Sequence, residues 1–498
     1  MNHFDRLIAV FSPERAIRNE LARRQLSQIT NRHEAATPGR FRQRNVVSNG
    51  PSTEVALSAV EIRARVRYEE QNSDVVRGAL DVIVGNIVGT GINIEPQIRL
   101  ESGELAVDVN KMMHDRWLEH CESPEVTKEH TKPQVQQLQC RTQFRDGEVF
   151  TQQLIGKVPG YRHTGEVPYA VELIEPDLVP IDYNDASEGI FYGIKKNKWG
   201  EPLRYYAYKE DPREAGHYFA SQDYREIQAS RMIHGKLTDR IGQMRGMSAF
   251  ASVLNRLGDV RDFEESERIA ARIASAQVMA VTRAANSGVS WSGSTQVSAD
   301  GQTDRMFSVS PGAVWDNLAP GEEVKILSSD RPNNQIEAFR NSQLRSAAAG
   351  LGVSYSSLAK HYDGSYSSQR QELVEQSIIY SRLRGNFIDS CCKPDWYGFV
   401  QACIAAGLLD TRGLDRRTLY KADFRGPPMP WIDPVKEIDA ELLLINNHLK
   451  SASQTIRERG NVPADVWRQI ELDKQTTDKF VPQGAPDVKP VLANKPAG

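Results

Sequence analysis

Apolar positions recur along this chain with two different periods, and the change of period separates helical from strand-forming stretches. Residues 57–91 and 107–120 repeat apolar side chains every three to four positions, which is typical of amphipathic helices. From Gly147 onwards, stretches such as EVFTQQLIG and YAVELIEPDLVP alternate apolar and polar residues between Gly, Pro and Asp. This period of two predicts antiparallel strands, in a small sheet or an open barrel.

The longest helical pattern follows the strand-forming region. Gly246 to Ala285 contains no proline and is rich in Ala, Leu, Glu and Arg, which predicts one long helix. Residues 286–304 are rich in Ser, Gly and Thr and predict a loop, and short strand-like pieces follow up to Leu327. Asn334 and Glu337 have the spacing of a capping box and predict a second helix that ends at glycine.

The last third of the chain is again helical. A third long helix is predicted from a cap at Ser368 to an interruption at Pro394. The string GPPMPWIDP then separates it from helical segments between Val435 and Lys474, and the Pro-rich residues beyond Phe480 predict a disordered tail. The order is therefore helices, a β unit, a long helix out, a small β cap, helices back and a terminal helical group.

Charge is distributed unevenly along the chain. The first 67 residues contain 12 Arg, no Lys and 6 acidic residues, a net charge of +6. The whole chain carries −3 at neutral pH, which leaves −9 for the remainder. A basic arm thus precedes an acidic body, and we expect the arm to contact a neighbouring subunit or an anionic surface.

Composition places the chain in a reducing compartment without a membrane span. The longest apolar tract, residues 78–94, is interrupted by Asp81, Asn86 and several glycines. The apolar run Leu7–Phe11 is too short for a signal-peptide core. Five cysteines without a C-x-x-C pair fit a cytoplasmic protein that needs no disulfides.

The sequence offers no recognisable catalytic, cofactor or metal motif. Gly156-Lys157 is followed by Val158, so the phosphate-binding loop of NTPases is absent. His114, His120 and Cys121 do not have the spacing of zinc ligands. The acidic run from Asp262 to Glu267 lies on one predicted helix between arginines, which favours a solvated or intersubunit charge face over a two-metal nuclease site. We therefore expect no enzyme, with a metal-dependent DNA-processing enzyme as the less favoured alternative.

A series of short strings resembles the portal proteins, or head-tail connectors, of lambda-like tailed bacteriophages. They occur in the family's order over nearly the whole chain, which makes the resemblance specific. The strings are GNIVGTGINIEP, QCRTQFRDGEVF, ELIEPDLV, MIHGKLTDRIGQMRGMSAFASVL, PGAVWDNLAPGEEV, AAAGLGVSYSSLAKHYDGSYSSQRQELVE and WIDPVKEIDAE.

The resemblance implies an α+β fold that is mainly α, organised as the regions of a portal. The wing would hold helices and a small antiparallel β unit, followed by a long-helix stem, a small α/β clip and a helical crown. In this sequence the regions would be an Arg-rich arm at 1–50, wing at 51–245, stem helix at 246–285, clip at 286–327, second stem helix at 328–352, tunnel loop at 353–368, wing helices at 369–430, crown at 431–480 and a disordered tail at 481–498.

The resemblance also implies a function and partners. The chain would form a dodecameric ring at one capsid vertex of the virion, through which double-stranded DNA is packaged and ejected without sequence specificity. Its partners would be the terminase, scaffold and major capsid proteins, and head-completion or tail-joining proteins, met in the host cytoplasm during assembly. A channel-less helical scaffold or adaptor protein of the virion is the alternative from another class.

Two candidate sites come from this resemblance. Residues 353–368 are rich in Ser and Tyr, with too little apolar content for a core, and correspond to the family's tunnel loop. There we expect Lys360, His361, Tyr362 and Asp363 to line the channel, with Lys360 making weak phosphate contacts; an ordinary surface loop at a subunit boundary is the alternative. In the clip, the aromatic side chains of Trp291 and Trp315 are expected to bind partner proteins.

Overall fold

A computed structural model describes residues 49–211, 213, 224–275, 279–283, 296–297, 303–304, 322–326, 336–428 and 434–480. The chain divides into two units, Met1–Glu54 and Val55–Gly498. The predicted Arg-rich arm before Asn49, both clip tryptophans and the predicted tail lie outside the described residues. Among the described residues, no helix combines the length and apolar character that a membrane crossing requires.

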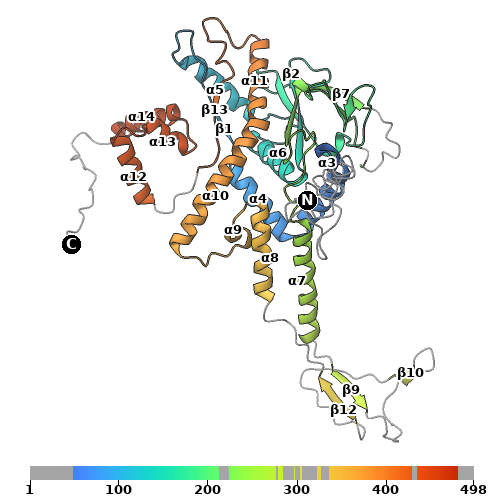
Figure 1. The fold of residues 1–498 in the computed structure, drawn as a ribbon. Helices are drawn as coiled ribbons and strands as arrows, with labels where there is room; N and C mark the ends of the chain where they lie inside the picture. The colour runs from blue at the N-terminus through green and yellow to red at the C-terminus, as the bar shows by residue number, and fades with distance from the viewer. Residues whose placement is uncertain are drawn as a thin grey trace, which may run out of the picture. The chain divides into compact units, whose positions relative to one another are not determined.

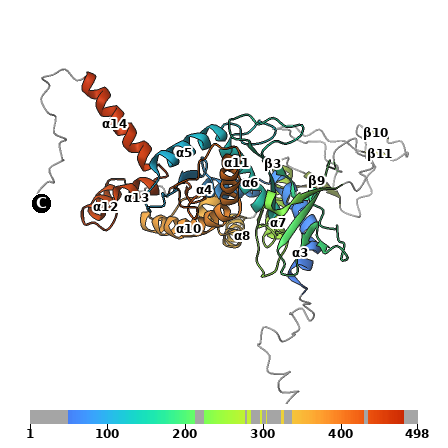
Figure 2. The same cartoon turned by 90° about the horizontal axis from the view of Figure 1, so that it is seen from above.

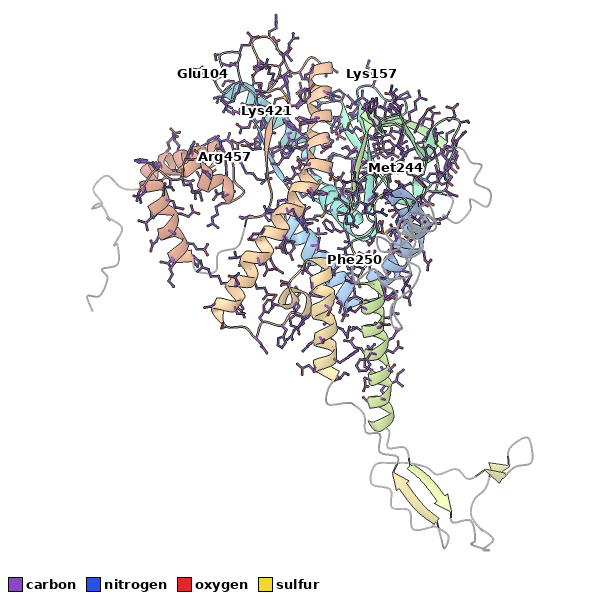
Figure 3. The ribbon with its side chains drawn as sticks, viewed as in Figure 1. Glu104, Lys157, Met244, Phe250, Lys421 and Arg457 are labelled. Atoms are coloured by element: carbon purple, nitrogen blue, oxygen red, sulfur yellow. The ribbon has the colours of Figure 1, made fainter. Side chains whose placement is uncertain are left out.

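Helices from both halves of the second unit build the first core. Helix α3 spans Pro51–Asn72 and α4 spans Asp74–Ile87, so the predicted stretch 57–91 forms two helices. The break falls at Ser73, whose side-chain oxygen accepts a hydrogen bond from the Val76 amide and so caps α4. Helix α6 (Lys132–Asp146) begins with a Thr131–Gln134 capping box. These helices pack with α8 (Ile336–Leu351), α10 (Tyr366–Phe387) and the turns before α7 (Leu254–Ser275). The buried side chains between them include Leu80, Ile83, Phe250 and Leu344 (Phe250 is labelled in Figure 3).

Two small antiparallel sheets confirm the predicted β unit. In the three-stranded sheet, β2 (Glu148–Ile155) lies between β3 (Tyr169–Ile174) and β8 (Met232–Lys236). Phe150 stands opposite Ile174 on one side and His234 on the other. The four-stranded sheet runs in chain order through β4 (Ile190–Phe191), β5 (Ile194–Lys196), β6 (Pro202–Tyr208) and β7 (Tyr224–Gln228). Single-turn 3₁₀ helices at Pro176–Leu178 and Ala229–Arg231 connect the strands.

A second core joins distant segments of the chain. Strand β1 (Asn93–Pro96) pairs with β13 (Ala422–Arg425), and helix α5 (Val107–Cys121) confirms the periodicity of residues 107–120. Their core is aromatic: the Trp117 ring lies 5.4 Å from Trp396 and 4.9 Å from Phe399, both on α11 (Lys393–Ala405).

The predicted long helix Gly246–Ala285 is shorter than expected. Helix α7 covers Leu254–Ser275, and Met279–Arg283 forms strand β9, paired with β12 (Glu322–Ile326). Residues before Leu254 form turns, and within them Gly246 packs closely against the backbone of Gly147. A short pair, β10 (Gln296–Val297) and β11 (Thr303–Asp304), lies between β9 and β12 in the sequence, and α8 (Ile336–Leu351) follows them. Figure 1 shows β9 and β12 side by side.

The third predicted helix is longer than the sequence indicates. After the short helix α9 (Tyr355–Ala359), α10 runs over Tyr366–Phe387 with Ser365 as its cap, three residues before the expected cap at Ser368. Pro394 does not end it, because a π-helical turn at Ile388–Cys392 leads into α11 (Lys393–Ala405), where the proline occupies the first turn.

Three helices confirm the predicted terminal helical group: α12 (Pro434–Asn446), α13 (Ala452–Glu458) and α14 (Pro463–Phe480). Polar contacts tie it to the second core: Arg457 on α13 pairs with Glu95 on β1, which also pairs with Arg425 on β13, and His114 on α5 lies 3.5 Å from Asp465 on α14. Figure 2 shows the ribbon of α14 next to that of α5. The fold is therefore α+β and mainly helical, as predicted.

Candidate functional site at the base of helices α7 and α8

Helices α7 and α8 pack against each other as a pair. The rings of Phe263 and Phe339 lie 4.8 Å apart, and Arg340 pairs with Glu264. Nearer the body, the pair is anchored by buried apolar side chains, among them Leu254 and Leu344. The pair is therefore fixed to the first core at one end, where α7 begins and α8 ends.

A buried ion cluster fixes the chain just before α7. The carboxylate of Glu148, wholly buried on β2, accepts hydrogen bonds from the Arg245 guanidinium (2.7 to 3.0 Å), from Arg63 Nη2 (3.1 Å) and from the Gly246 amide (2.9 Å). His234 Nε2 lies 3.1 Å from the same carboxylate. These five residues are called the Glu148 clamp below. It joins α3, β2, β8 and the entry to α7.

Electrostatics keep this carboxylate ionised. Burial alone would raise the pKa of Glu148, but the charge of Arg245 and the hydrogen bonds from His234 and Arg245 hold this pKa well below its usual range. Arg245 is also fully engaged: its Nη1 donates to the carbonyls of Val179 (3.0 Å) and Tyr192 (2.9 Å). A buried cation and anion that satisfy each other in this way hold the segments in one arrangement.

A second layer of ion pairs surrounds the clamp. Asp146 pairs with Arg67 and Arg145, and Asp177 pairs with Arg63 and Arg67. Arg63 and Arg67 lie on α3, and Arg145 and Asp146 lie on α6. The ion pairs therefore hold both helices against the β unit.

The clamp makes folding sensitive to acid. Burial lowers the pKa of His234 from its ordinary 6.5 to about 4. Between these values the unfolded chain binds a proton that the folded chain excludes, so stability present above pH 6.5 is lost as the pH falls towards 4. We expect His234→Gln, which keeps a hydrogen-bond donor without titrating, to show a shallower decline of Tm over this window. Replacing exposed His448 by Gln is the control; curves of equal slope for wild type and His234→Gln would contradict the prediction.

The predicted channel residues follow the short helix α9. Lys360 ends α9 in a left-handed conformation (φ 54°), and Lys360 to Asp363 are all exposed. His361 Nε2 lies 3.2 Å from the Asp363 carboxylate, and Gln369 on α10 donates to the Tyr362 carbonyl at 2.8 Å. The segment contributes more to the core than expected, because Val353 and Leu358 are buried.

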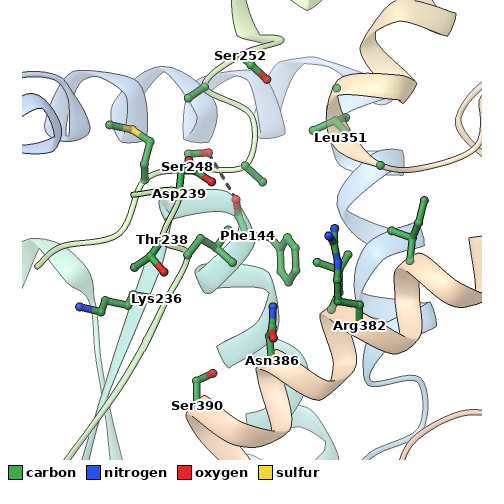
Figure 4. Close-up of a pocket in the computed structure, with 18 of the residues that line it drawn as sticks. Phe144, Lys236, Thr238, Asp239, Ser248, Ser252, Leu351, Arg382, Asn386 and Ser390 are labelled. Carbon is green, nitrogen blue, oxygen red and sulfur yellow. Dashed lines mark hydrogen bonds between the residues drawn. The ribbon is translucent and has the colours of Figure 1, made fainter. Parts of the chain in front are cut away.

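An open groove lies beside the end of α8 (Figure 4). It has a volume of about 870 Å³ and is bounded by residues 236–239, 247–252 and 349–352 and by α10 and the π turn. Ser248 on its floor donates to the carbonyl of Phe144 at 3.4 Å. We call it the α8 groove.

The described residues contain no group of three or more His, Cys, Asp or Glu side chains placed to hold a metal ion. His120 instead lies among the rings of Trp117, Tyr169 and Phe399, and burial lowers its pKa to about 3. Trp291 and Trp315 lie outside the described residues, so their predicted role in partner binding stays a prediction.

One known protein family matches most of the chain. The family described as "Phage portal protein, lambda family" matches residues 37–384. The chain belongs to this family. Its members are structural portal proteins.

Individual portal proteins are similar over shorter or longer stretches. The "Probable portal protein" of Halomonas phage phiHAP-1 is 24% identical over 431 residues, covering 83% of this chain and 79% of that protein. The "Portal protein" of Escherichia phage N15 is 26% identical and covers 56% of this chain and 57% of its own length. "Portal protein B" of Escherichia phage lambda is 26% identical and covers 32% of this chain and 31% of its own length.

The solved structures with a similar fold have lower sequence identity to this chain. A chain in the virion of a native gene transfer agent particle is 10% identical, with a TM-score of 0.47, and covers 84% of this chain and 97% of its own. A HK97 family phage portal protein from Corynebacterium diphtheriae is 12% identical, with a TM-score of 0.32, and covers 62% of this chain and 85% of its own.

Family strings in this portal protein contribute the Glu148 clamp. RDGEVF supplies Glu148, MIHGK supplies His234, and QMRGM supplies Arg245 and Gly246. Sequence reasoning singled out these strings without assigning them a role, and it missed Arg63, which lies 85 residues from Glu148. The sequence of β2, EVFTQQLI, carries Glu148 next to the apolar pair Val149 and Phe150 but does not indicate that Glu148 meets a buried cation.

Proposed function

We propose that the chain assembles into a closed ring at one capsid vertex, through which double-stranded DNA enters and leaves the head. Membership of the lambda portal family over residues 37–384 is the observation that carries the proposal. By resemblance the ring is a dodecamer, and it docks the terminase motor, scaffold and capsid proteins, and head-completion proteins. The segment with Trp291 and Trp315 is the proposed docking region for terminase or head-completion proteins.

The charge of α7 suits a conduit. Over Leu254–Ser275 it carries four Arg and five acidic residues, so its net charge is slightly negative. Dense phosphate contacts repeated around a ring would hold DNA strongly, because each neutralised phosphate adds to the affinity. A nearly neutral helix pair lets DNA pass without being held or read.

Electron microscopy of the purified chain tests the proposal. We expect negative-stain images to show annular particles with a central hole. Compact or filamentous particles without a hole would overturn it in favour of a scaffold or adaptor protein. Cleavage of plasmid DNA that depends on a divalent metal would favour the DNA-processing enzyme instead.

The exposed residues after α9 are the proposed contacts with DNA in the channel. Replacing Lys360 and His361 together by alanine should leave rings intact, because neither side chain is buried. We expect the amount of DNA retained in filled heads to fall roughly two- to tenfold, since one cationic contact is lost from every subunit. Retention is measured by nuclease protection of head DNA.

A matched control separates this effect from a general loss of surface charge. Lys157 is an exposed lysine in the turn after β2 (labelled in Figure 3), and Lys157→Ala should leave DNA retention unchanged. Normal retention in the Lys360→Ala, His361→Ala variant would instead support a surface loop at a subunit boundary.

A further inference from the structure

Helix α3 carries a second apolar stripe that the described part of the chain leaves exposed. Its inner face buries Val55, Ala59 and Val66. On another face, Leu57 (74% exposed), Val60 (51% exposed) and Ala64 are spaced three and four residues apart and therefore lie in one row along the helix. We call this row the outer α3 stripe. A helix with two apolar faces is typical of an element that packs on two sides.

The α8 groove has the form that would accept a helix. The residues along two of its sides are small: Ala249, Ala251 and Ser252 in the turns before α7, and Ala349, Gly350 and Gly352 at the end of α8. Glycine at position 350 lets α8 pack closely against the turn before α7, since a Cβ there would lie 2.6 Å from Val253 Cγ1. Small side chains at these positions keep the groove open to a close approach.

A fully exposed isoleucine stands beside this groove. Ile241 lies two residues after Asp239, which lines the groove, and its side chain is completely exposed. The turn that presents it is held firmly: Gln243 accepts from the Asp239 amide (3.0 Å), and Lys236 Nζ donates to the carbonyls of Gln243 and Met244 (2.9 Å each). A large apolar side chain held in solvent by a rigid turn is typical of an interaction surface.

One exposed charge on each surface could pair with the other, although the groove as a whole is lined by two basic and two acidic residues, Lys236, Arg382, Asp239 and Asp389. Glu61 lies on α3 one residue after Val60, and Arg382 lines the groove from α10. Both are exposed, and neither has an ion-pair partner within the part of the chain that the structure describes. Opposite charges at two unfilled surfaces favour their association over other pairings.

We propose that the outer α3 stripe of one copy of the chain lies in the α8 groove of the next copy, with Glu61 facing Arg382. No residue that lines the groove belongs to α3, so the two surfaces are different patches of one chain. A contact between different patches is heterologous, and repetition of such a contact around an axis closes a ring. The inference rests on the proposed ring and names the surfaces that build it.

Cysteine cross-linking tests the contact directly. The variant carries Val60→Cys on the stripe and Ser252→Cys in the groove, with Cys121→Ser to remove the one native thiol that is not fully buried. After mild oxidation, a denaturing gel without reductant should show a ladder of multimers, because every subunit carries both halves of the contact. A product limited to dimers, or monomer alone, from preparations that form rings would overturn the inference while the proposed function stands.

A second pair of cysteines serves as the control, and a separate outcome would overturn the proposed function itself. Pairing Val60→Cys with Ser187→Cys, an exposed position in the β unit, should give no ladder. Preparations that contain no annular particles would overturn both the ring and this contact.

Charge reversal provides an independent test. Glu61→Arg and Arg382→Glu should each lower the yield of rings by about five- to tenfold in size-exclusion chromatography, because each places like charges together at every interface. The double variant should recover most of the yield. Glu104→Arg, at an exposed position away from both surfaces, should have no effect (Figure 3). Single variants without effect, or a double variant no better than either, would contradict the pairing.

Discussion

Replacing Glu148 by glutamine is expected to lower the free energy of unfolding by about 3 to 5 kcal/mol, the cost of breaking a buried ion pair from one side. The carboxylate is wholly buried, and its loss leaves the Arg245 guanidinium charged and buried with one set of partners missing. Urea denaturation followed by tryptophan fluorescence measures the change, since Trp117 and Trp396 lie in the adjoining core.

An exposed pair and a double variant serve as controls. Arg204 and Glu226 pair across β6 and β7 with half of each side chain exposed, so Glu226→Gln should cost less than about 1 kcal/mol. Adding Arg245→Met to Glu148→Gln should cost less than the sum of the two single changes, because no buried cation then remains opposite the amide. Additive costs would show that Glu148 and Arg245 contribute independently, contrary to the clamp.

The spacing of apolar residues predicted those helices and strands that depend on neighbouring residues in the sequence. The helix over residues 107–120 and the alternating strands after Gly147 follow from periodicity, and α5, β2 and β3 confirm them. The helix over Gly246–Ala285 was predicted too long at both ends, for reasons that lie far away in the sequence. Met279–Arg283 forms a strand because β12, some 40 residues later, pairs with it.

The candidate site was less accessible to sequence reasoning than the fold. The strings resembling the portal family marked the right segments, but the clamp depends on which side chains meet. Arg63 and Glu148 are 85 residues apart, and Arg245 and Glu148 are 97 apart. Nothing in the spacing of charges within one helix or strand indicates such pairs, because the fold alone brings them together.

Substituting either glycine at the contact between Gly147 and Gly246 should be at least as damaging as breaking the clamp. A Cβ at Gly246 would lie 2.0 Å from the Gly147 carbonyl oxygen, and one at Gly147 would lie 2.3 Å from the Met247 carbonyl carbon. The opposing atoms are backbone, so they cannot rotate away. Gly147 also ends α6 with φ 92°, a left-handed conformation that is strained for other residues. We expect Gly246→Ala to cost about 3 kcal/mol or more by urea denaturation, combining overpacking with displaced backbone.

The backbone displacement caused by Gly246→Ala should also impair ring assembly, because Gly246 lies where the chain leaves the β unit for α7. Moving this point shifts α7 relative to the core that anchors it, so fewer annular particles are expected at equal concentrations of folded chain. Gly258→Ala is the matched control: it lies within α7 with open space at its Cβ, so alanine should stabilise the helix by up to about 1 kcal/mol. If Gly246→Ala unfolds at the same urea concentration as Gly258→Ala, then the close approach of Gly147 and Gly246 does not position α7.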